Sequence, residues 1–327
     1  MDKQPGVLLD TRPEEEKAKD YKFEEIVAAG ESVNWVEKSS YRKFPISDQD
    51  GSSSCVAQTL KKLQGIYIWL KTGAFVKLSA SHIYQRRANR PGEGMAGVDA
   101  MEIGRKGVTL EEFAPSEKLT DAQMDSMNVS SFEDEVGKVF KLGNYVQLAP
   151  GNIDTVASII QKTGKGVMVW FYFQKNEWTK VPTIENPTLS HTGAKTLRHS
   201  VAAVDFTLYK GKKALVIDDS WGAATALQGQ RIITEDFFAK RNFFAAYFIN
   251  FAFEGGAGGK PRYDGTIKSL QDCLKYEGTF PSNVGSTGVM GPITKKAVVD
   301  FQVKHGITPA LGNVGPITTA KLQALYP

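Results

Sequence analysis

The strongest helical pattern in the chain begins at residue 55. Apolar residues recur there at steps of three and four, which puts them on one face of a helix. They are Val56, Leu60, Leu63, Tyr67 and Leu70. Residues 47–54 read SDQDGSSS, a polar loop, and lead directly into this pattern. We therefore predict a helix that starts at Cys55 and is anchored in a core along that face.

The second half of the chain has the pattern of β-strands. Its aromatic and β-branched runs are bounded by Gly, Asn or Lys-Gly-Lys, as in antiparallel strands joined by turns. These runs cover residues 166–173, 199–209, 212–222 and 243–253. The turn at Lys210-Gly211-Lys212 predicts a hairpin between the second run and the third. A helical half followed by an antiparallel sheet half indicates an α+β fold.

The last part of the chain repeats a short motif. Gly-Pro-Ile-Thr occurs at Gly291 and again at Gly315. Proline is favoured in the first turn of a helix, where its missing N–H is no loss, so each copy predicts the start of a helix. The repeat indicates a small all-α domain with internal similarity.

Changes in composition divide the chain into four segments. Residues 1–30 contain the charged run EEEKAKDYKFEE and are expected to form an exposed helix or a strap on the surface, without chemistry. Residues 31–253 hold the helical and strand patterns. Residues 254–262 are rich in glycine, as a flexible linker is. Residues 263–327 hold the helical repeat.

Composition and charge exclude several classes of function. The 327 residues include 40 basic and 36 acidic ones, a net charge of +4 without a long Lys or Arg run, so we expect no nucleic-acid partner. No stretch approaches the roughly 18 apolar residues of a membrane span, and the first residues lack the apolar core of a signal peptide. We expect no membrane partner, no metal and no cofactor, and we see no export signal.

Cys55 is the leading candidate for a reactive group. The two cysteines of the chain, Cys55 and Cys273, lie in different predicted domains, which argues against a disulfide framework. A helix N-terminus stabilises negative charge and so favours the thiolate, which is the nucleophilic form of cysteine. The alternative is that Cys55 is an inert core residue, as most buried free cysteines are.

A thiol nucleophile needs a base, and the chain has four histidines: His82, His191, His199 and His305. His199 begins an apolar strand, where burial would fix its ring. Asp219 ends the next strand, so the predicted hairpin brings it beside His199, where it would orient the imidazole. Strand alternation turns Asp218 to the opposite face. The alternatives are a core histidine bonded for stability and a solvated aspartate at a strand end.

These residues resemble a known family. SDQDGSSSCVA is similar to the active-site loop of papain-like cysteine peptidases, HSVAAVDF to their histidine strand, and VIDDSWG to their strand-end motif, which usually ends Asn-Ser-Trp-Gly. The resemblance implies a two-lobed fold, a helical lobe followed by an antiparallel β lobe. It also implies that Cys55 is the nucleophile, His199 the general base and acid, Asp219 the orienting group and Gln49 a donor to the oxyanion hole.

The same resemblance implies a substrate site and some departures from the family. Gly97, Val98 and Trp221 are expected to bind substrate, with the glycine-rich loop followed by a short helix at 99–105. Val98 stands where the family usually has a second glycine, and Asp219 where it usually has asparagine. Ser52 and Met95 stand where the family usually has a cysteine pair that forms a disulfide, so that bridge is absent. The leading segment is shorter than the usual inhibitory propeptide, so inhibition of that kind is not expected.

The tail resembles a second family. Residues 263–327 are similar to a peptidoglycan-binding domain of the small three-helix type, with Leu-Gln early, then Gly-Pro-x-Thr, then Ala-Val-x-x-Phe-Gln. This resemblance implies a wall glycan as partner. In this interpretation Cys273 is a structural helix residue, and Leu274 and Phe301 belong to the core.

Together the two resemblances imply a cysteine peptidase that forms an acyl-enzyme on a Cys-His-Asp triad and is targeted to the cell wall by its tail. Its substrate would be a protein or peptide, and its expected location is the cell wall or the extracellular space. Two alternatives remain: a lysin that cuts the peptide bonds of peptidoglycan, and a non-catalytic wall-binding or virion component.

Overall fold

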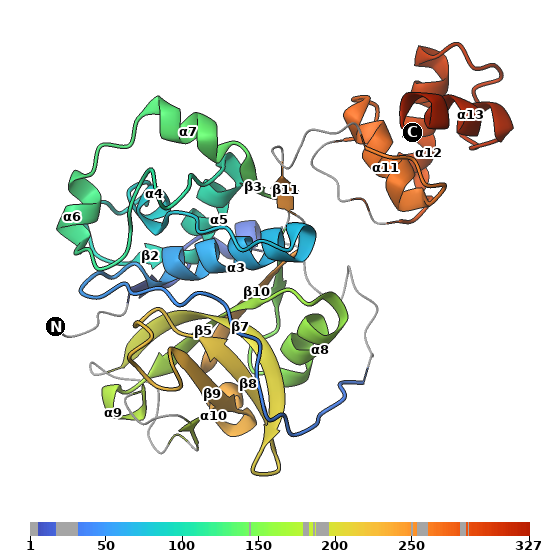
Figure 1. Ribbon diagram of the computed structural model, residues 1–327. Helices are drawn as coiled ribbons and strands as arrows, with labels where there is room; N and C mark the ends of the chain where they lie inside the picture. Colours follow the sequence, from blue (N-terminus) through green and yellow to red (C-terminus); the bar gives the residue numbers. More distant parts are fainter. Residues whose placement is uncertain are drawn as a thin grey trace. The chain divides into compact units, whose positions relative to one another are not determined.

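The computed structural model describes residues 6–17, 32–143, 145–178, 183–185, 187, 196–249, 251–253, 261–281, 286 and 288–327. The chain divides into two compact units, Met1–Glu254 and Gly255–Pro327 (Figure 1). Most of the predicted linker, 254–260, lies outside the described residues, as do residues 1–5 and 18–31 of the leading segment. No described helix is long and apolar enough to cross a membrane.

The first half of the N-terminal unit is mainly helical. Its central helix α3 runs from Cys55 to Thr72, as the apolar pattern predicts. Val56, Leu60 and Leu63 are buried along it, whereas Leu70 is 38% exposed because the last turn emerges from the core. The other helices here are α1 (Glu14–Lys17), α4 (Ala80–Tyr84), α5 (Gly97–Lys106), α6 (Asp121–Ser126) and α7 (Ser131–Gly137).

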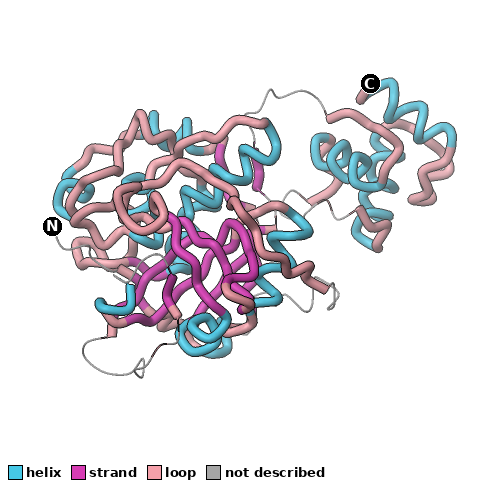
Figure 2. Tube along the Cα trace, turned by 60° about the horizontal axis from the view of Figure 1, so that its bottom comes forward, coloured by secondary structure: helices cyan, strands magenta, loops and turns pink. Residues whose placement is uncertain are grey.

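The second half is built on a seven-stranded sheet with the order β4-β10-β5-β7-β8-β9-β6 (Figure 2). Neighbouring strands are antiparallel except for the β6–β9 pair. The strands are β4 (Tyr145–Leu148), β5 (Val167–Phe173), β6 (Thr183–Ile184), β7 (Leu197–Tyr209), β8 (Lys212–Asp218), β9 (Gln230–Thr234) and β10 (Asn242–Phe248). The predicted hairpin is confirmed, because Tyr209 pairs with Lys212 across the turn.

Two cores lie on the two faces of this sheet. Helix α3 contacts β5 and β7 from one side, and α8 (Ile153–Thr163) and α10 (Glu235–Arg241) contact the same sheet from the other. A short helix, α9 (Lys175–Trp178), follows β5. Two further two-stranded pairings join β1 (Val7–Leu8) to β2 (Met95–Ala96) and β3 (Phe140–Leu142) to β11 (Phe251–Phe253).

The predicted elements differ from the observed ones in detail. The apolar run at 243–253 is divided between β10 and β11, which belong to different sheets. Helix α5 begins at Gly97, earlier than the predicted start at residue 99. The short strands β3, β4 and β9 and the helices α8 and α10 were not predicted. The mixed helical and antiparallel composition is as predicted.

The C-terminal unit has three described helices, α11 (Ile267–Tyr276), α12 (Pro292–Lys304) and α13 (Pro316–Leu325). As predicted, each Gly-Pro opens a helix. The repeat has a structural cause: the Gln271 side chain donates to Thr294 Oγ1 at 2.9 Å, and Gln302 donates to Thr318 Oγ1 at the same distance. Each glutamine thereby fixes the first turn of the helix that its Gly-Pro opens. Cys273, Leu274 and Phe301 are fully buried in the core of this unit, as predicted.

Candidate active site

Cys55 is the first residue of α3 and is fully buried. The helix N-cap, Ser54, makes no side-chain capping bond, and its hydroxyl instead contacts that of Ser52 at 2.8 Å. The first turn of α3 contains no acidic residue. The positive end of the helix is therefore not neutralised by a side chain of its own first turn.

His199 lies on β7, where its backbone pairs with Phe171 of β5. Its Nε2 lies 2.7 Å from Oδ1 of Asp219, and both side chains are fully buried. Among the described residues, Nδ1 of His199 has no conventional hydrogen-bond partner. Cys55 nevertheless interacts with the imidazole, and Nδ1 is the nitrogen left for its thiol. The structure thus brings together Cys55, His199 and Asp219.

The electrostatics of this group favour a charged imidazole. Burial alone would lower the pKa of His199, but the Asp219 carboxylate and Cys55 outweigh that effect and raise it to about 9. Burial likewise opposes ionisation of Asp219, yet the charges of His199 and Arg231 hold the pKa of its carboxyl below the usual value. A proton on the imidazole and a negative charge on the carboxylate are mutually stabilising.

Asp218 and Asp219 point to different partners. Asp218 accepts a hydrogen bond from Lys62 at 3.1 Å and from Gln230 at 2.8 Å, whereas Asp219 is the carboxylate beside His199. This is the alternation expected of neighbouring residues at a strand end. Asp219, the aspartate that the sequence places beside His199, is therefore the one that contacts it.

Aromatic rings enclose the His199–Asp219 contact. The Trp178 ring lies edge-on to the imidazole with ring centroids 5.4 Å apart, and the Trp221 ring lies 5.2 Å away. The Trp178 indole also donates to Oδ2 of Asp219 at 2.9 Å. The Trp221 ring therefore lies beside His199, and its predicted contact with substrate stays a prediction.

Gln49 is held beside the segment that follows Asp219. Its carbonyl Oε1 accepts from the Ser220 hydroxyl at 2.5 Å, and its Nε2 donates to the Ser52 carbonyl at 2.8 Å. The backbone N–H of Gln49 also bonds the Ser220 carbonyl at 2.8 Å. These bonds connect the Cys55 loop to the Ser-Trp-Gly motif and fix the amide group of Gln49 near the start of α3.

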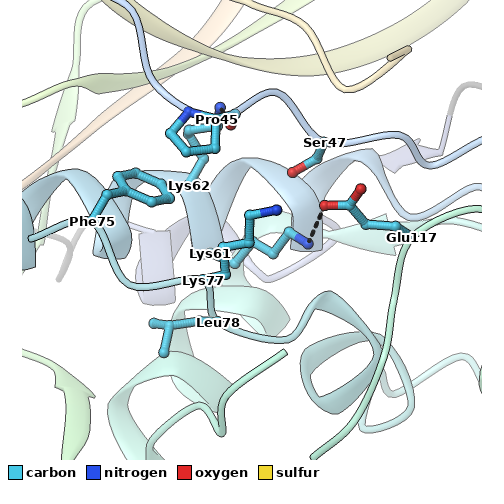
Figure 3. A pocket seen from close by; sticks show the side chains of 8 residues that line it. All are labelled: Pro45, Ser47, Lys61, Lys62, Phe75, Lys77, Leu78 and Glu117. Atoms are coloured by element: carbon cyan, nitrogen blue, oxygen red, sulfur yellow. Dashed lines mark hydrogen bonds and ion pairs between the residues drawn. The ribbon is translucent and has the colours of Figure 1, made fainter. Parts of the chain in front are cut away.

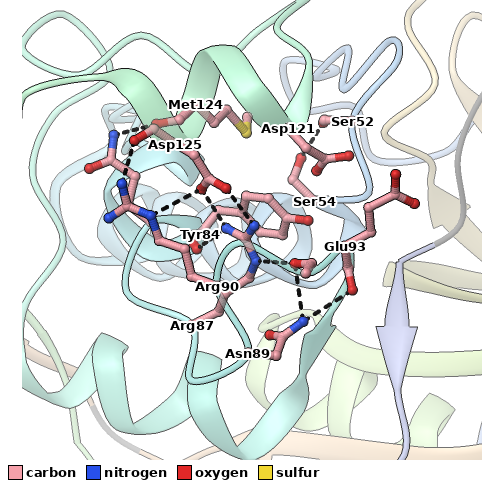
Figure 4. A network of polar contacts seen from close by, with 12 residues as sticks. Ser52, Ser54, Tyr84, Arg87, Asn89, Arg90, Glu93, Asp121, Met124 and Asp125 are labelled. Carbon is pink, nitrogen blue, oxygen red and sulfur yellow. Dashed lines mark hydrogen bonds and ion pairs between the residues drawn. The ribbon is translucent and has the colours of Figure 1, made fainter.

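The glycine-rich loop is fastened by side chains rather than by a disulfide (Figure 4). Tyr84 accepts from the Gly94 N–H at 2.9 Å and hydrogen-bonds Asp121, which in turn accepts from the Ser53 N–H at 3.0 Å. Arg87 donates to the Gly92 carbonyl at 2.8 Å. This chain of polar contacts joins the Cys55 loop to the glycine loop where the resemblance leads one to look for a cysteine pair.

Gly97 and Val98 lie in the first turn of α5, not in an open loop. Gly97 is buried, and a Cβ there would lie 1.9 Å from Cη2 of Trp170, so the glycine is required by the packing of that ring. Val98 is half-buried. Their contact with substrate stays a prediction.

The strand β1, at the start of the leading segment, pairs with the glycine loop. The Met95 N–H donates to the Gly6 carbonyl at 2.7 Å, and Val7 pairs with Met95 in parallel. A Cβ on Gly6 would lie 1.6 Å from the Ser53 carbonyl oxygen, and β1 also contacts β7. Residues 6–8 therefore lie between the Cys55 loop, the glycine loop and the histidine strand, whereas most of the described residues from 9 to 15 are exposed, as expected of a surface strap.

Two buried lysines of α3 border a small cavity (Figure 3). Lys61 donates to Glu111 at 3.1 Å and to Ser116 at 2.9 Å, and Lys62 contacts Asp218 and the Pro45 carbonyl. The cavity measures about 10 Å³, which is room for about one water. These lysines are paired, and the cavity is too small for an organic ligand.

The other histidines and the second cysteine lie elsewhere. His82 and His305 contact Asp134 and Glu277, respectively, and His191 lies outside the described residues. Burial and then nearby carboxylates raise the pKa of Cys273 to about 12, which disfavours its thiolate. Within the described ranges, no group of three or more His, Cys, Asp or Glu side chains could hold a metal ion.

Sequence reasoning missed Arg231, Trp178, Tyr84 and Asp121. None lies in a motif near Cys55, His199 or Asp219, and each reaches the site only through tertiary packing. A buried arginine in the apolar run of β9, which reads Gln-Arg-Ile-Ile-Thr, was the one available signal.

Comparisons with known proteins support two different kinds of domain in this chain. A family model described as "Putative peptidoglycan binding domain" matches residues 264–322. A comparison with curated protein sequences finds no match. The tail therefore carries the peptidoglycan-binding type of domain that the motifs predict.

Solved structures similar to this chain include several cysteine proteases. Xylellain from Xylella fastidiosa is 18% identical, with a TM-score of 0.58 over 75% of this chain and 95% of that one. The protease and lectin-like domains of Cwp84, a surface layer associated protein of Clostridium difficile, are 19% identical, with a TM-score of 0.53 over 69% and 54%. Procathepsin L2 from Tenebrio molitor is 18% identical, with a TM-score of 0.52 over 75% and 83%. The papain-like fold is thereby confirmed.

Proposed function

We propose that this chain is a papain-like cysteine peptidase whose nucleophile is Cys55 and whose tail holds it on the cell wall. The observation that carries the proposal is the buried contact of His199 with Asp219, 2.7 Å long, whose free imidazole nitrogen is left for the Cys55 thiol. A nucleophile at a helix start, a base and an oriented carboxylate together are the requirement for acyl transfer through a thiol.

The proposed reaction has two halves. The Cys55 thiolate attacks the carbonyl carbon of a peptide bond, and His199 gives its proton to the leaving amine nitrogen as the C–N bond breaks. The acyl group is then held as a thioester on Sγ. A water molecule gives a proton to His199 and attacks the thioester carbon, which releases the carboxylic acid and restores the thiolate and imidazolium.

Negative charge develops on the carbonyl oxygen in each half. Two donors are proposed to stabilise it, the backbone N–H of Cys55 and the side-chain amide of Gln49. The support for Gln49 is its fixed position: Ser220 binds its carbonyl oxygen, which turns the amide nitrogen toward the Ser52 end of the loop. Ser220 thus has a role in orienting the oxyanion donor.

The strand β1 is proposed to obstruct the substrate edge in the state that the structure describes. One general way for an extended peptide to bind a protein is to pair with an exposed strand edge. Here Met95 of the glycine loop already donates its N–H to Gly6. A substrate that uses the same edge would have to displace residues 6–8 first.

Peptidoglycan itself is a second candidate substrate, because the domain matched at 264–322 is of a type described as binding it. One preparation of the full chain, incubated with a denatured protein and with purified peptidoglycan, separates the two. New amino termini from the denatured protein alone support a peptidase held on the wall. New amino termini from peptidoglycan alone support a lysin.

The control is Cys55→Ser, with Cys273→Ser as the matched variant of the other cysteine. Loss of cleavage in Cys55→Ser and its retention in Cys273→Ser are expected. The same two substrates are also given to Gly6→Ala, in which β1 is displaced. If neither the parent nor this variant cuts either substrate, the chain is a binding protein and the proposal is wrong.

A further inference from the structure

Arg231 is a buried cation beside the site that the proposed reaction does not use. It lies on β9, its side chain is 2% exposed, and its Nε donates to Oδ2 of Asp219 at 2.7 Å. Its Nη1 donates to the backbone carbonyl of Trp178 at 2.6 Å. Removing a guanidinium from water is costly, so such a charge is kept only where a partner offsets it. The partner here is the carboxylate that orients His199.

The carboxylate of Asp219 accepts from donors on both oxygens. Oδ1 accepts hydrogen bonds from Nε2 of His199 at 2.7 Å and from the backbone N–H of Ser220 at 2.8 Å. Oδ2 accepts hydrogen bonds from the Trp178 indole N–H at 2.9 Å and from the Arg231 guanidinium. Every donor fixes the plane of the carboxylate, and a neutral amide could not accept from all four because its NH₂ group is itself a donor.

We propose that Arg231 is a positioning residue of the catalytic group: it holds Asp219 in place and offsets its charge, so that His199 keeps an oriented partner without binding its proton too tightly. The proposal rests on the proposed function, in which His199 must release its proton to the leaving amine in every cycle. An uncompensated carboxylate at 2.7 Å would resist that release, because an opposite charge stabilises the imidazolium. A carboxylate shared with Arg231 resists it less.

The other charged groups around the site leave this balance intact. Cys55 faces His199 from α3, and Arg231 faces Asp219 from β9. Two more buried ion pairs include sequence neighbours of the site: Lys62 pairs with Asp218, and Arg241 pairs with Glu177, the residue before Trp178. Each of these pairs is neutral as a unit, so the Asp219–Arg231 pair sets the local charge that His199 experiences.

Three variants test the compensation: Arg231→Met, Asp219→Asn and the two combined. The rate at which iodoacetamide alkylates Cys55 is measured against pH, because this rate reads the thiolate and its imidazolium without any peptide substrate. The upper inflection of the profile marks loss of the proton from His199. Arg231→Met leaves a net negative charge and should move this inflection up, and Asp219→Asn leaves a net positive charge and should move it down. Each shift should be about one pH unit or more.

The double variant is the decisive member of the set. It removes both charges, so its inflection should return to within a few tenths of a pH unit of the parent value. Its Tm should also exceed that of either single variant, which leaves one buried charge unpaired. Arg231→Lys keeps the charge but not the fork of N–H donors, so it should keep the parent inflection and lose only stability.

Several results would overturn the inference. Single variants with the parent inflection, or a double variant as displaced as Asp219→Asn, would show that Arg231 has no influence on His199. If neither single variant folds, a double variant that also fails contradicts the compensation, and one that folds supports it. Failure of the proposed function is a different result: Cys55 of the parent would then react like an ordinary thiol, whose alkylation rate rises in a single step at about pH 8.5 and shows no reactive plateau at lower pH.

Discussion

Replacing Gly6 with alanine should release the strand that lies against the substrate loop. The Cβ of the new residue would fall 1.6 Å from the Ser53 carbonyl oxygen and 2.4 Å from its carbon. Both are backbone atoms of the loop that precedes Cys55, which cannot move aside as the tip of a flexible side chain can. The strand therefore has to leave its place, together with the bond between the Gly6 carbonyl and Met95.

The size of the effect follows from what holds the strand. Val7 is 2% exposed and Leu8 is half-buried, which together with one hydrogen bond stabilises the strand by roughly 4 kcal/mol. Ordering three residues costs roughly 3 to 5 kcal/mol. The strand is thus held by at most about 1 kcal/mol, which corresponds to a block of about 5-fold or less. We expect kcat/KM to rise by up to about 5-fold in Gly6→Ala.

The assay is cleavage of a fluorogenic peptide, with hydrogen exchange at the Met95 amide as a separate measure of strand release. Leu9→Ala is the matched control, because Leu9 is 46% exposed just beyond the strand and its truncation should change neither measure. Faster exchange at Met95 with unchanged kcat/KM would show that β1 does not lie in the path of the substrate. A fall in kcat/KM would show that the strand helps to form the site.

Three further predictions concern the catalytic group and the division of the chain. Gln49→Ala should lower kcat about 100- to 1000-fold, because an oxyanion donor is lost. Gln49→Glu should be equally impaired, because the carboxylate still accepts from Ser220 but has no N–H group to donate. Parental kcat values in both variants would show that Gln49 is not an oxyanion donor. The pKa of His199 is raised from 6.5 to about 9, so its contribution to the free energy of unfolding should be complete below pH 6.5 and lost as pH rises through 9. The value of kcat/KM should fall over the same upper range. Urea titrations and rate profiles measure the two, and a decline centred near pH 6.5 in either would contradict the prediction. Residues 1–253 should fold and keep peptidase activity without the tail, while residues 261–327 alone should sediment with peptidoglycan; an inactive soluble truncation would show that the tail completes the site.

Cys55, His199 and Asp219 could be found from the sequence because each stands at a recognisable boundary. Cys55 follows a polar loop and opens a periodic helix, and the other two lie at facing ends of a hairpin whose turn is readable. Local patterns of this kind specify a register, and the register brings side chains together. The repeat of the tail was readable for the same reason, since a Gly-Pro helix start is a local signal.

Arg231 and Trp178 could not be found in that way. Each reaches Asp219 only because β8, β9 and α9 pack together, and no short pattern in either segment indicates that packing. The strand β1 is a different case. It consists of two residues and pairs through backbone groups that every residue has. The side chains of this segment therefore give little indication that it forms a strand. Gly6 is the exception, because the close approach to Ser53 admits no side chain.

Asp218, which ends β8, and Asp219, which directly follows it, have a joint effect on the site. Asp219 faces His199, and Asp218 faces Lys62 of α3, the helix that begins with Cys55. The Lys62–Asp218 pair is buried on both sides, so a change of either partner would leave an unpaired charge at the interface of helix and sheet. It therefore ties α3 to the end of β8. Since the nucleophile is carried by that helix and the orienting group directly follows that strand, the distance from thiol to imidazole depends on an ion pair that takes no part in the chemistry.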